Sequence, residues 1–172
     1  MEFVNLTRHT GIGSNCYWLS VGGKNIILDA GSDPKVDGIG STPDLRPLPP
    51  GTVDAIIITH AHQDHIGSLP VVTRQEQRCP VFMTPATAAI ATIMLHNSVN
   101  VMMRQREELG LMEYPLYTHR SVDLCAQSWV HCGLRQRYNL TGERSENDDE
   151  VTFEFYNAGH ILGSVGVLIR HK

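Results

Sequence analysis

One run of residues constrains the fold of this chain more than any other. Residues 53–59 read VDAIIIT, a nearly continuous β-branched stretch that is typical of a strand buried on both faces. The run leads directly into the sequence HAHQDH, which begins at His60. A strand buried on both faces needs a layer of structure on either side, so we expect a layered α/β fold. The polar cluster then lies where a core strand ends.

The cluster itself has the composition of a metal site. It holds His60, His62, Asp64 and His65 within six residues. Side chains at a strand end alternate with period two, so His60 and His62 can point to the same side. Asp64 and His65 follow where the chain bends, and can face a second position. Imidazole-rich donor sets suit zinc. The spacing of the two pairs of side chains predicts two metal ions rather than one. The alternative is a surface loop that happens to be rich in histidine.

Two other segments could complete such a site. Residues 157–164 read NAGHILGS, in which Gly159 and Gly163 allow sharp turns on either side of His160. Together with the upstream cluster, this predicts His160 as a metal ligand. Residues 26–31 read IILDAG, a strand that ends in Asp29. Asp29 could cap a turn. Alternatively, it could accept hydrogen bonds from the loop that carries the histidine cluster (residues 59–65, here the metal loop) or from a ligand histidine, and hold that loop in place.

In this order, a strand-end aspartate, an HxHxDH motif and a later Gly-His turn resemble the metallo-β-lactamase superfamily. The sequences HAHQDHIGSLP (residues 60–70) and AGHILGS (residues 158–164) are similar to those of the β-CASP ribonucleases, of the mRNA 3′-end-processing endonuclease type. The resemblance implies an α/β fold, the αβ/βα layered sandwich of that superfamily. It also implies a zinc-dependent hydrolase that cleaves the phosphodiester bonds of RNA with metal-activated water.

The resemblance also assigns roles to single residues. His60, His62 and His160 would bind a first zinc ion, while Asp64 and His65 would contribute to a second. Asp64 would be the catalytic residue that orients or deprotonates the attacking water, and Asp29 would support the site. Two other functions stay open: a small-molecule hydrolase of thioesters, lactones or β-lactams, and a non-catalytic scaffold subunit.

The family pattern continues beyond what this chain contains. In the family, an aspartate that bridges both metals follows the next strand, and a last histidine comes much later; this chain ends at Lys172. Residues 1–172 are therefore expected to form a partial domain, C-terminally incomplete and without the β-CASP insert. We expect two zinc ions in a complete site but one or none here, so the chain alone is expected to be inactive. An open sheet edge predicts self-association.

Composition limits the remaining possibilities. The chain has 172 residues, the size of one domain, and a net charge of −4, unlike the basic proteins that coat nucleic acids. We find no apolar run of membrane-spanning length and no secretory signal, so no membrane contact is expected. The four cysteines form no CxxC pair and are expected to be reduced thiols, which favours a cytoplasmic location.

Local patterns predict the remaining elements. Thr84 and Pro85 are a strong helix start, and the helix could run to Gly110 with Ile90, Ile93, Met94 and Val101 on one apolar face. His9 could contact substrate. The other predicted elements are strands at 3–6, 16–21, 25–28, 81–83, 151–156 and 165–169, helices at 66–73 and within 121–132, and loops at 31–51 and 142–150.

Overall fold

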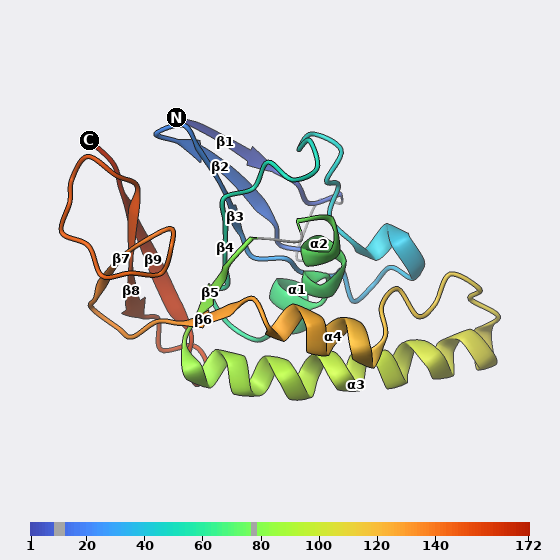
Figure 1. Cartoon of the computed structure of the whole chain (residues 1–172). Helices are drawn as coiled ribbons and strands as arrows, with labels where there is room; N and C mark the ends of the chain where they lie inside the picture. Colours follow the sequence, from blue (N-terminus) through green and yellow to red (C-terminus); the bar gives the residue numbers. More distant parts are fainter. Residues whose placement is uncertain (9–12, 77–78) are drawn as a thin grey trace.

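The computed structural model describes residues 1–8, 13–76 and 79–172, so His9 lies outside the described residues (Figure 1). Two sheets and four α-helices make up the described part of the chain. The strands are β1 (Glu2–Asn5), β2 (Tyr17–Val21), β3 (Lys24–Leu28), β4 (Ala55–Ile57), β5 (Val81–Met83), β6 (Trp129–His131), β7 (Arg137–Asn139), β8 (Thr152–Asn157) and β9 (Val165–Arg170). The helices are α1 (Gln63–Ile66), α2 (Leu69–Gln75), α3 (Pro85–Leu109) and α4 (His119–Ala126), with a 3-10 turn at Gly38–Ser41.

The larger sheet has the order β1-β2-β3-β4-β5-β6. Its first three strands pair antiparallel, and β3 to β6 pair parallel. The carboxyl ends of parallel strands meet at one edge of a sheet, where ligands commonly bind in α/β proteins. The segment after β3 and the segment after β4 are thereby brought together. The smaller sheet, β7-β8-β9, is antiparallel throughout.

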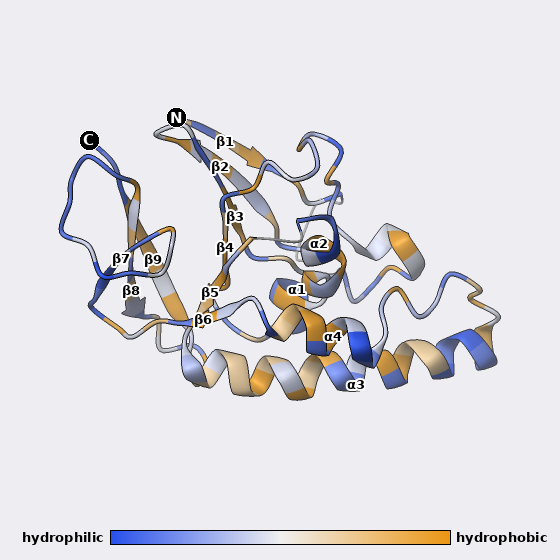
Figure 2. Ribbon diagram, viewed as in Figure 1, coloured by the Kyte–Doolittle hydropathy of each residue, from blue (hydrophilic) through white to orange (hydrophobic). Residues whose placement is uncertain are grey.

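The strand β4 lies in the middle layer and is buried on both faces, as its sequence predicts. Ile56 belongs to the core shared with the helices, whereas Ile57 packs in a second core with Phe153 and Phe155 of β8. The described chain is therefore layered as helices, large sheet and small sheet. Figure 2 shows the C-terminal turns of α3 as hydrophilic, in contrast to the hydrophobic strands of this middle layer.

The helix α3 begins and ends where the sequence predicts. The hydroxyl of Thr84 accepts a hydrogen bond from the amide of Thr87, and Gly110 ends the helix in a left-handed conformation with φ 68°. The predicted apolar face is wrong in part, because Ile93 is 71% exposed and Val101 is 43% exposed. The side chains that α3 buries in the core are instead Thr87, Ala88, Ala91, Leu95, Val99 and Met102.

By length and composition alone, α3 could cross a membrane, since an 18-residue window of it has a mean hydropathy of 1.2. The expectation that no segment meets this test is therefore wrong. One such helix is weak evidence for a membrane span, because core helices of soluble proteins pass the same test. Here one face of α3 packs against the core that also contains Ile56 and Ile58.

Two other predictions of elements need correction, and two strands were missed. The helix expected at 66–73 is two helices, α1 and α2, which are separated at Gly67 and Ser68. The helix expected within 121–132 is α4 followed by the strand β6. The strands β6 and β7 have three residues each, too few for an alternating pattern to identify them. The four cysteines are free and buried, as expected.

Candidate metal centre

The candidate metal centre lies at the carboxyl edge of the parallel strands. Asp29 follows β3 directly, and Thr59 and His60 follow β4. The turn that carries His160 reaches the same edge from the small sheet, because the amide of Val165 in β9 donates to the carbonyl of Thr59 at 3.0 Å. This bond joins two segments that are about a hundred residues apart in the sequence.

Three imidazoles converge at this edge. His60, His62 and His160 each offer a ring nitrogen, and these three atoms all lie within 4.8 Å of one another. The ring centroids form a triangle whose three sides are each 4.9 Å. Nε2 of His160 lies 3.2 Å from Nδ1 of His62. Among the described residues, this is the one group of at least three histidine, cysteine or acidic side chains whose donor atoms are close enough to hold a metal ion.

The environment of His60 favours the form of imidazole that binds metals. Its side chain is buried, and burial together with the nearby charge of His65 lowers its pKa to about 4. The hydroxyl of Thr59 lies 3.0 Å from its Nδ1. A ring that stays neutral at physiological pH keeps a lone pair available for a metal ion without first losing a proton.

Asp29 holds the start of the metal loop, as one of the two sequence hypotheses proposes. It is buried, with a positive φ of 59°, and its carboxylate accepts hydrogen bonds from the amide of Thr59 at 2.8 Å and from the Thr59 hydroxyl. Its Oδ2 also lies 2.7 Å from Nδ1 of His65. Burial alone would lower the pKa of His65, but the bond to Asp29 and the charges of Asp29 and Asp64 raise it.

Asp64 and His65 lie beside the three-histidine group but are not part of it. The ring centroid of His65 is 4.0 Å from that of His60, and Nε2 of His65 is 3.5 Å from Oδ2 of Asp64. Asn15 joins them, since its Nδ2 lies 3.1 Å from Oδ2 of Asp64 and 3.2 Å from Nε2 of His65. The structure thus places all five predicted ligands at one edge of the sheet, three of them in direct convergence.

The sequence reading missed Asn15. It precedes β2 in a Gly-rich segment and belongs to no motif, so only its position just before a strand could have indicated a role. Its main chain holds the metal loop as well, because the amide of Asn15 donates to the carbonyl of Asp64 at 2.9 Å. The loop is packed so tightly that a Cβ at Gly31 would lie 1.7 Å from the same carbonyl oxygen.

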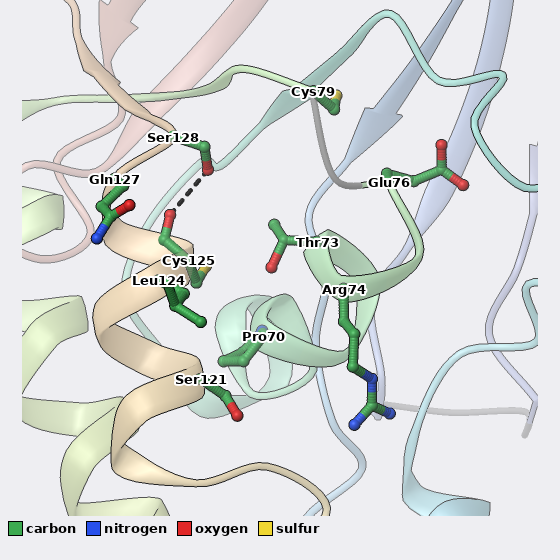
Figure 3. Close-up of a pocket in the computed structure, with 10 residues that line it drawn as sticks. All are labelled: Pro70, Thr73, Arg74, Glu76, Cys79, Ser121, Leu124, Cys125, Gln127 and Ser128. Carbon is green, nitrogen blue, oxygen red and sulfur yellow. Dashed lines mark hydrogen bonds between the residues drawn. The ribbon is translucent and has the colours of Figure 1, made fainter.

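One cavity lies away from the candidate metal centre. A cavity of about 440 Å³ between α2 and α4 is lined by Thr73, Cys79 and Cys125, and by no residue of the metal loop (Figure 3). Burial raises the pKa of the Cys79 thiol to about 12 and also raises that of Cys125, so both sulfurs are poor nucleophiles. Neither thiol is therefore a candidate nucleophile in this cavity.

A second cavity lies between the metal loop and α3. It has a volume of about 320 Å³, and Gln63, between His62 and Asp64, contributes to its lining. In the side chain of Gln63, Nε2 donates to the hydroxyl of Ser32 at 3.1 Å, and Oε1 accepts from the hydroxyl of Ser98 in α3 at 2.9 Å. The first turn of α1 is thereby fixed to α3, which limits how far the loop can move.

Comparison with known proteins identifies the fold. Residues 9–87 match the metallo-beta-lactamase superfamily. A metallo-beta-lactamase superfamily protein from Sulfolobus tokodaii superposes with a TM-score of 0.57 at 18% identity, over 97% of this chain and 59% of that protein. The metallo-beta-lactamase fold protein YhfI from Bacillus subtilis superposes with a TM-score of 0.55 at 14% identity, over 97% of this chain and 56% of that protein. The expected α/β fold of that superfamily is confirmed.

Curated relatives point to one branch of the superfamily. The chain is 33% identical over 166 residues to endoribonuclease ysh1 of Schizosaccharomyces pombe, covering 95% of this chain and 20% of that protein. It is 38% identical over 171 residues to endoribonuclease YSH1 of Gibberella zeae, covering 98% of this chain and 19% of that protein. It is 29% identical over 165 residues to Integrator complex subunit 11 of Danio rerio, covering 92% and 26%.

The chain thus spans about a fifth of the length of the endoribonucleases that it matches. Sequence motifs, fold and the convergence of His60, His62 and His160 agree with one another. Residues 9–87 thus match the metallo-β-lactamase superfamily, and over nearly its whole length the chain is similar to RNA-processing nucleases of the β-CASP type.

Proposed function

We propose that this chain is the metal-binding part of a nuclease that hydrolyses phosphodiester bonds in RNA. The observation that carries the proposal is the triangle of His60, His62 and His160, with Asp64 and His65 beside it. The relatives named as endoribonucleases support RNA as the substrate class. Because the chain covers about a fifth of those relatives, this activity is proposed for the protein as a whole.

The metal that suits this donor set is zinc. Three imidazoles, one of them held neutral by burial, match the nitrogen ligands that zinc prefers. We assign the first ion to His60, His62 and His160, and a second position to Asp64 and His65. A zinc ion here would act as a Lewis acid on the phosphodiester and lower the pKa of water at the site towards neutrality. We propose two ions in a complete site and one in this chain alone.

The chain's own groups provide the proton transfer. Nδ2 of Asn15 donates to Oδ2 of Asp64 and so fixes its carboxylate. Among the described residues, no hydrogen bond is made to Oδ1 of Asp64, so this oxygen can accept a proton from the attacking water. Asp29 keeps the proton of His65 on Nδ1 by accepting it in a hydrogen bond, which leaves Nε2 of His65 facing the site.

The test is a measurement of zinc content and of RNA cleavage. The dialysed wild-type chain is expected to retain zinc and His62→Ala to lose it, whereas His131→Ala, at an exposed position on β6, retains it. Cleavage of a synthetic RNA is then measured with the protein that contains this chain, with Asp64→Asn as the inactive variant. Zinc retained in full by His62→Ala would overturn the ligand assignment. Hydrolysis of thioesters, lactones or β-lactams in place of RNA would overturn the substrate class.

Three further expectations belong to this proposal. RNA is the partner, and no membrane contact is proposed, because α3 is part of the core. A cytoplasmic location stays a prediction. Self-association through the open edge of the small sheet also stays a prediction, and β9 is the strand at that edge in the described residues.

A further inference from the structure

A second cluster of histidine and aspartate side chains joins α3 to α4, away from the candidate metal centre. His96 lies on α3, and His119 and Asp123 lie on α4. Nδ1 of His96 is 2.8 Å from Nδ1 of His119, and Nε2 of His96 is 3.4 Å from Oδ1 of Asp123. His119 and Asp123 are four residues apart on one helix and therefore share a face. The three side chains thus line up as carboxylate, imidazole and imidazole.

The shorter separation is that of a hydrogen bond. The two ring centroids are 5.1 Å apart with an interplanar angle of 19°, so the rings meet edge to edge with their Nδ1 atoms facing each other. One of these nitrogens must carry the proton that lies between them. When it is His96 that donates, the other nitrogen of the same ring, Nε2, has a free lone pair directed at Asp123.

The longer separation is that of two ligands on one ion. At 3.4 Å, Nε2 of His96 and Oδ1 of Asp123 are farther apart than a good N–H···O hydrogen bond. Zinc bonds of about 2.0–2.2 Å at a tetrahedral angle place an imidazole nitrogen and a carboxylate oxygen about 3.4 Å apart. The pair therefore has the spacing of a shared cation without any movement of the helices.

We propose that His96 and Asp123 bind a divalent first-row transition cation, zinc above all, and that His119 is a positioning residue for this site. Nε2 of His96 and Oδ1 of Asp123 are the protein ligands, and water completes the coordination. His119 accepts the proton of Nδ1 and so fixes the tautomer of His96, which is the role that partners behind a ligand histidine have. The ion links α3 to α4.

The surroundings permit such an ion. The side chain of His96 is 31% exposed and that of Asp123 is 67% exposed, so a hydrated cation can reach both. From Pro85 to Met103, α3 carries no other titratable side chain, so no cation on that stretch competes for Asp123. Arg120, next to His119, is the only basic side chain on α4 apart from the histidine itself. This site goes beyond the proposed function, because none of its residues belongs to the three-histidine group.

The test is zinc binding by the folded chain in competition with a chromophoric chelator. The wild type is expected to show a tight class of site at the three-histidine group and a second, weaker class. His96→Ala and Asp123→Asn should each abolish the weaker class and leave the tight one. His119→Ala should weaken it by about 10-fold, as loss of a partner behind a metal ligand does. His131→Ala and Asp149→Asn are the matched controls and should change neither class.

Three results would overturn the inference. The weaker class could persist in His96→Ala, it could persist in Asp123→Asn, or His119→Ala could abolish it as completely as His96→Ala does. Far-UV circular dichroism of each variant without zinc checks that it folds. A titration of the wild type followed by imidazole NMR tests the ligand atom without any substitution, since Nε2 of His96 and not Nδ1 should shift with the weaker class. Failure of the proposed function would appear separately, as loss of the tight class.

Discussion

At the residue scale, Asp29 connects the candidate metal centre to the fold. It sits at the end of β3 in a left-handed conformation and receives hydrogen bonds from both Thr59 and His65. Thr59 in turn lies against Nδ1 of His60. The buried carboxylate of Asp29 thereby orients Thr59, which precedes the HAHQDH motif, and His65, the last histidine of that motif. Asp29 is not itself part of the three-histidine group.

Asp29→Asn tests this role. Asparagine tolerates the left-handed backbone, so the change acts on the hydrogen bonds rather than on the turn. Its amide group cannot accept from Thr59 and His65 together. We expect zinc affinity to fall by about 10- to 100-fold and the free energy of unfolding by about 1–3 kcal/mol. Chelator competition and urea unfolding measure the two effects.

Asp54→Asn is the matched control for Asp29→Asn. Asp54 also accepts from a backbone amide and a side chain, those of Asn25 and Lys24, but far from the metal loop. It should cost stability without changing zinc affinity. Equal zinc affinity in Asp29→Asn and the wild type would show that Asp29 caps its turn and does nothing for the site.

The pKa of His60 predicts a pH dependence of stability for the metal-free chain. Burial and the charge of His65 lower this pKa to about 4, whereas an unfolded histidine titrates near 6.5. Between these values the unfolded chain binds more protons, so stability falls as the pH falls from about 6.5 to 4. The raised pKa of His65 acts in the opposite direction, because its contribution is lost as the pH rises through that pKa.

Urea unfolding at pH 7 and pH 5 measures this dependence, with His60→Asn as the comparison. We expect the loss of stability at pH 5 to be smaller in the variant by about 1 kcal/mol, which allows for solvent screening near the open site. Identical pH dependence in the two proteins would mean that His60 titrates normally in the folded chain.

The convergence of His60, His62 and His160 could be predicted from sequence because these residues lie in two short motifs. His60 and His62 sit within one HxH, and the glycines around His160 mark the second segment. Asn15 could not be predicted in the same way. Its contact with Asp64 depends on how the segment before β2 packs against the start of α1, which local patterns do not encode.

At the element scale, the turn that presents His160 is held by its contact with α3. The carbonyl of Gly163 accepts from the hydroxyls of Thr84 at 2.9 Å and Thr87 at 3.0 Å, at the first turn of the helix. Gly163 has a φ of +84°, and a Cβ there would lie 2.7 Å from the backbone nitrogen of Thr87. Backbone cannot move away as a flexible side chain could.

Gly163→Ala is therefore expected to displace the His160 turn from α3. Stability should fall by about 2–3 kcal/mol, from the left-handed strain and the clash together, and zinc affinity should fall with it. Gly159→Ala is a matched control, because Gly159 also has a positive φ, +69°, but nothing lies within 4 Å of its Cβ position. Thermal unfolding and chelator competition compare the two variants. Equal effects would mean that backbone strain alone matters.

Both ends of the longest helix were predictable, whereas the two short strands β6 and β7 were not. Thr84, Pro85 and Gly110 mark both ends of α3, because capping and helix termination are local. Which face of α3 packs inward is not local, and Ile93 is exposed although its spacing suggested burial. The break between α1 and α2 lies at Ser68, which leaves the helical region with φ −103° and ψ 3° and has no helix-breaking residue type to announce it.

At the scale of the whole molecule, the two sheets differ in how their faces are covered. The large sheet is covered by the helices on one face and by the small sheet on the other. The outer face of the small sheet is covered by no helix in the part of the chain that the structure describes (Figure 1). There Tyr156 is 39% exposed and Leu168 is 40% exposed.

The edge of the small sheet adds to this exposed surface. In the described residues β9 pairs only with β8, which leaves one row of its backbone groups available to another strand. Such edges favour pairing between molecules, and inward or flanking charges are the usual protection. Arg170 is the one charged side chain on β9, and it is paired with Glu154 at 2.8 Å.

We therefore expect the chain to self-associate in a concentration-dependent way through β9. Leu168→Lys places a charge in the middle of this strand and should shift the population towards monomer, because pairing would then bury or align two lysines. Met112→Lys is the control: that side chain is 73% exposed in the segment after α3. Sedimentation velocity across a wide range of concentration measures both. A wild type that stays monomeric at the highest concentration, or an equal shift in Met112→Lys, would place any association elsewhere than β9.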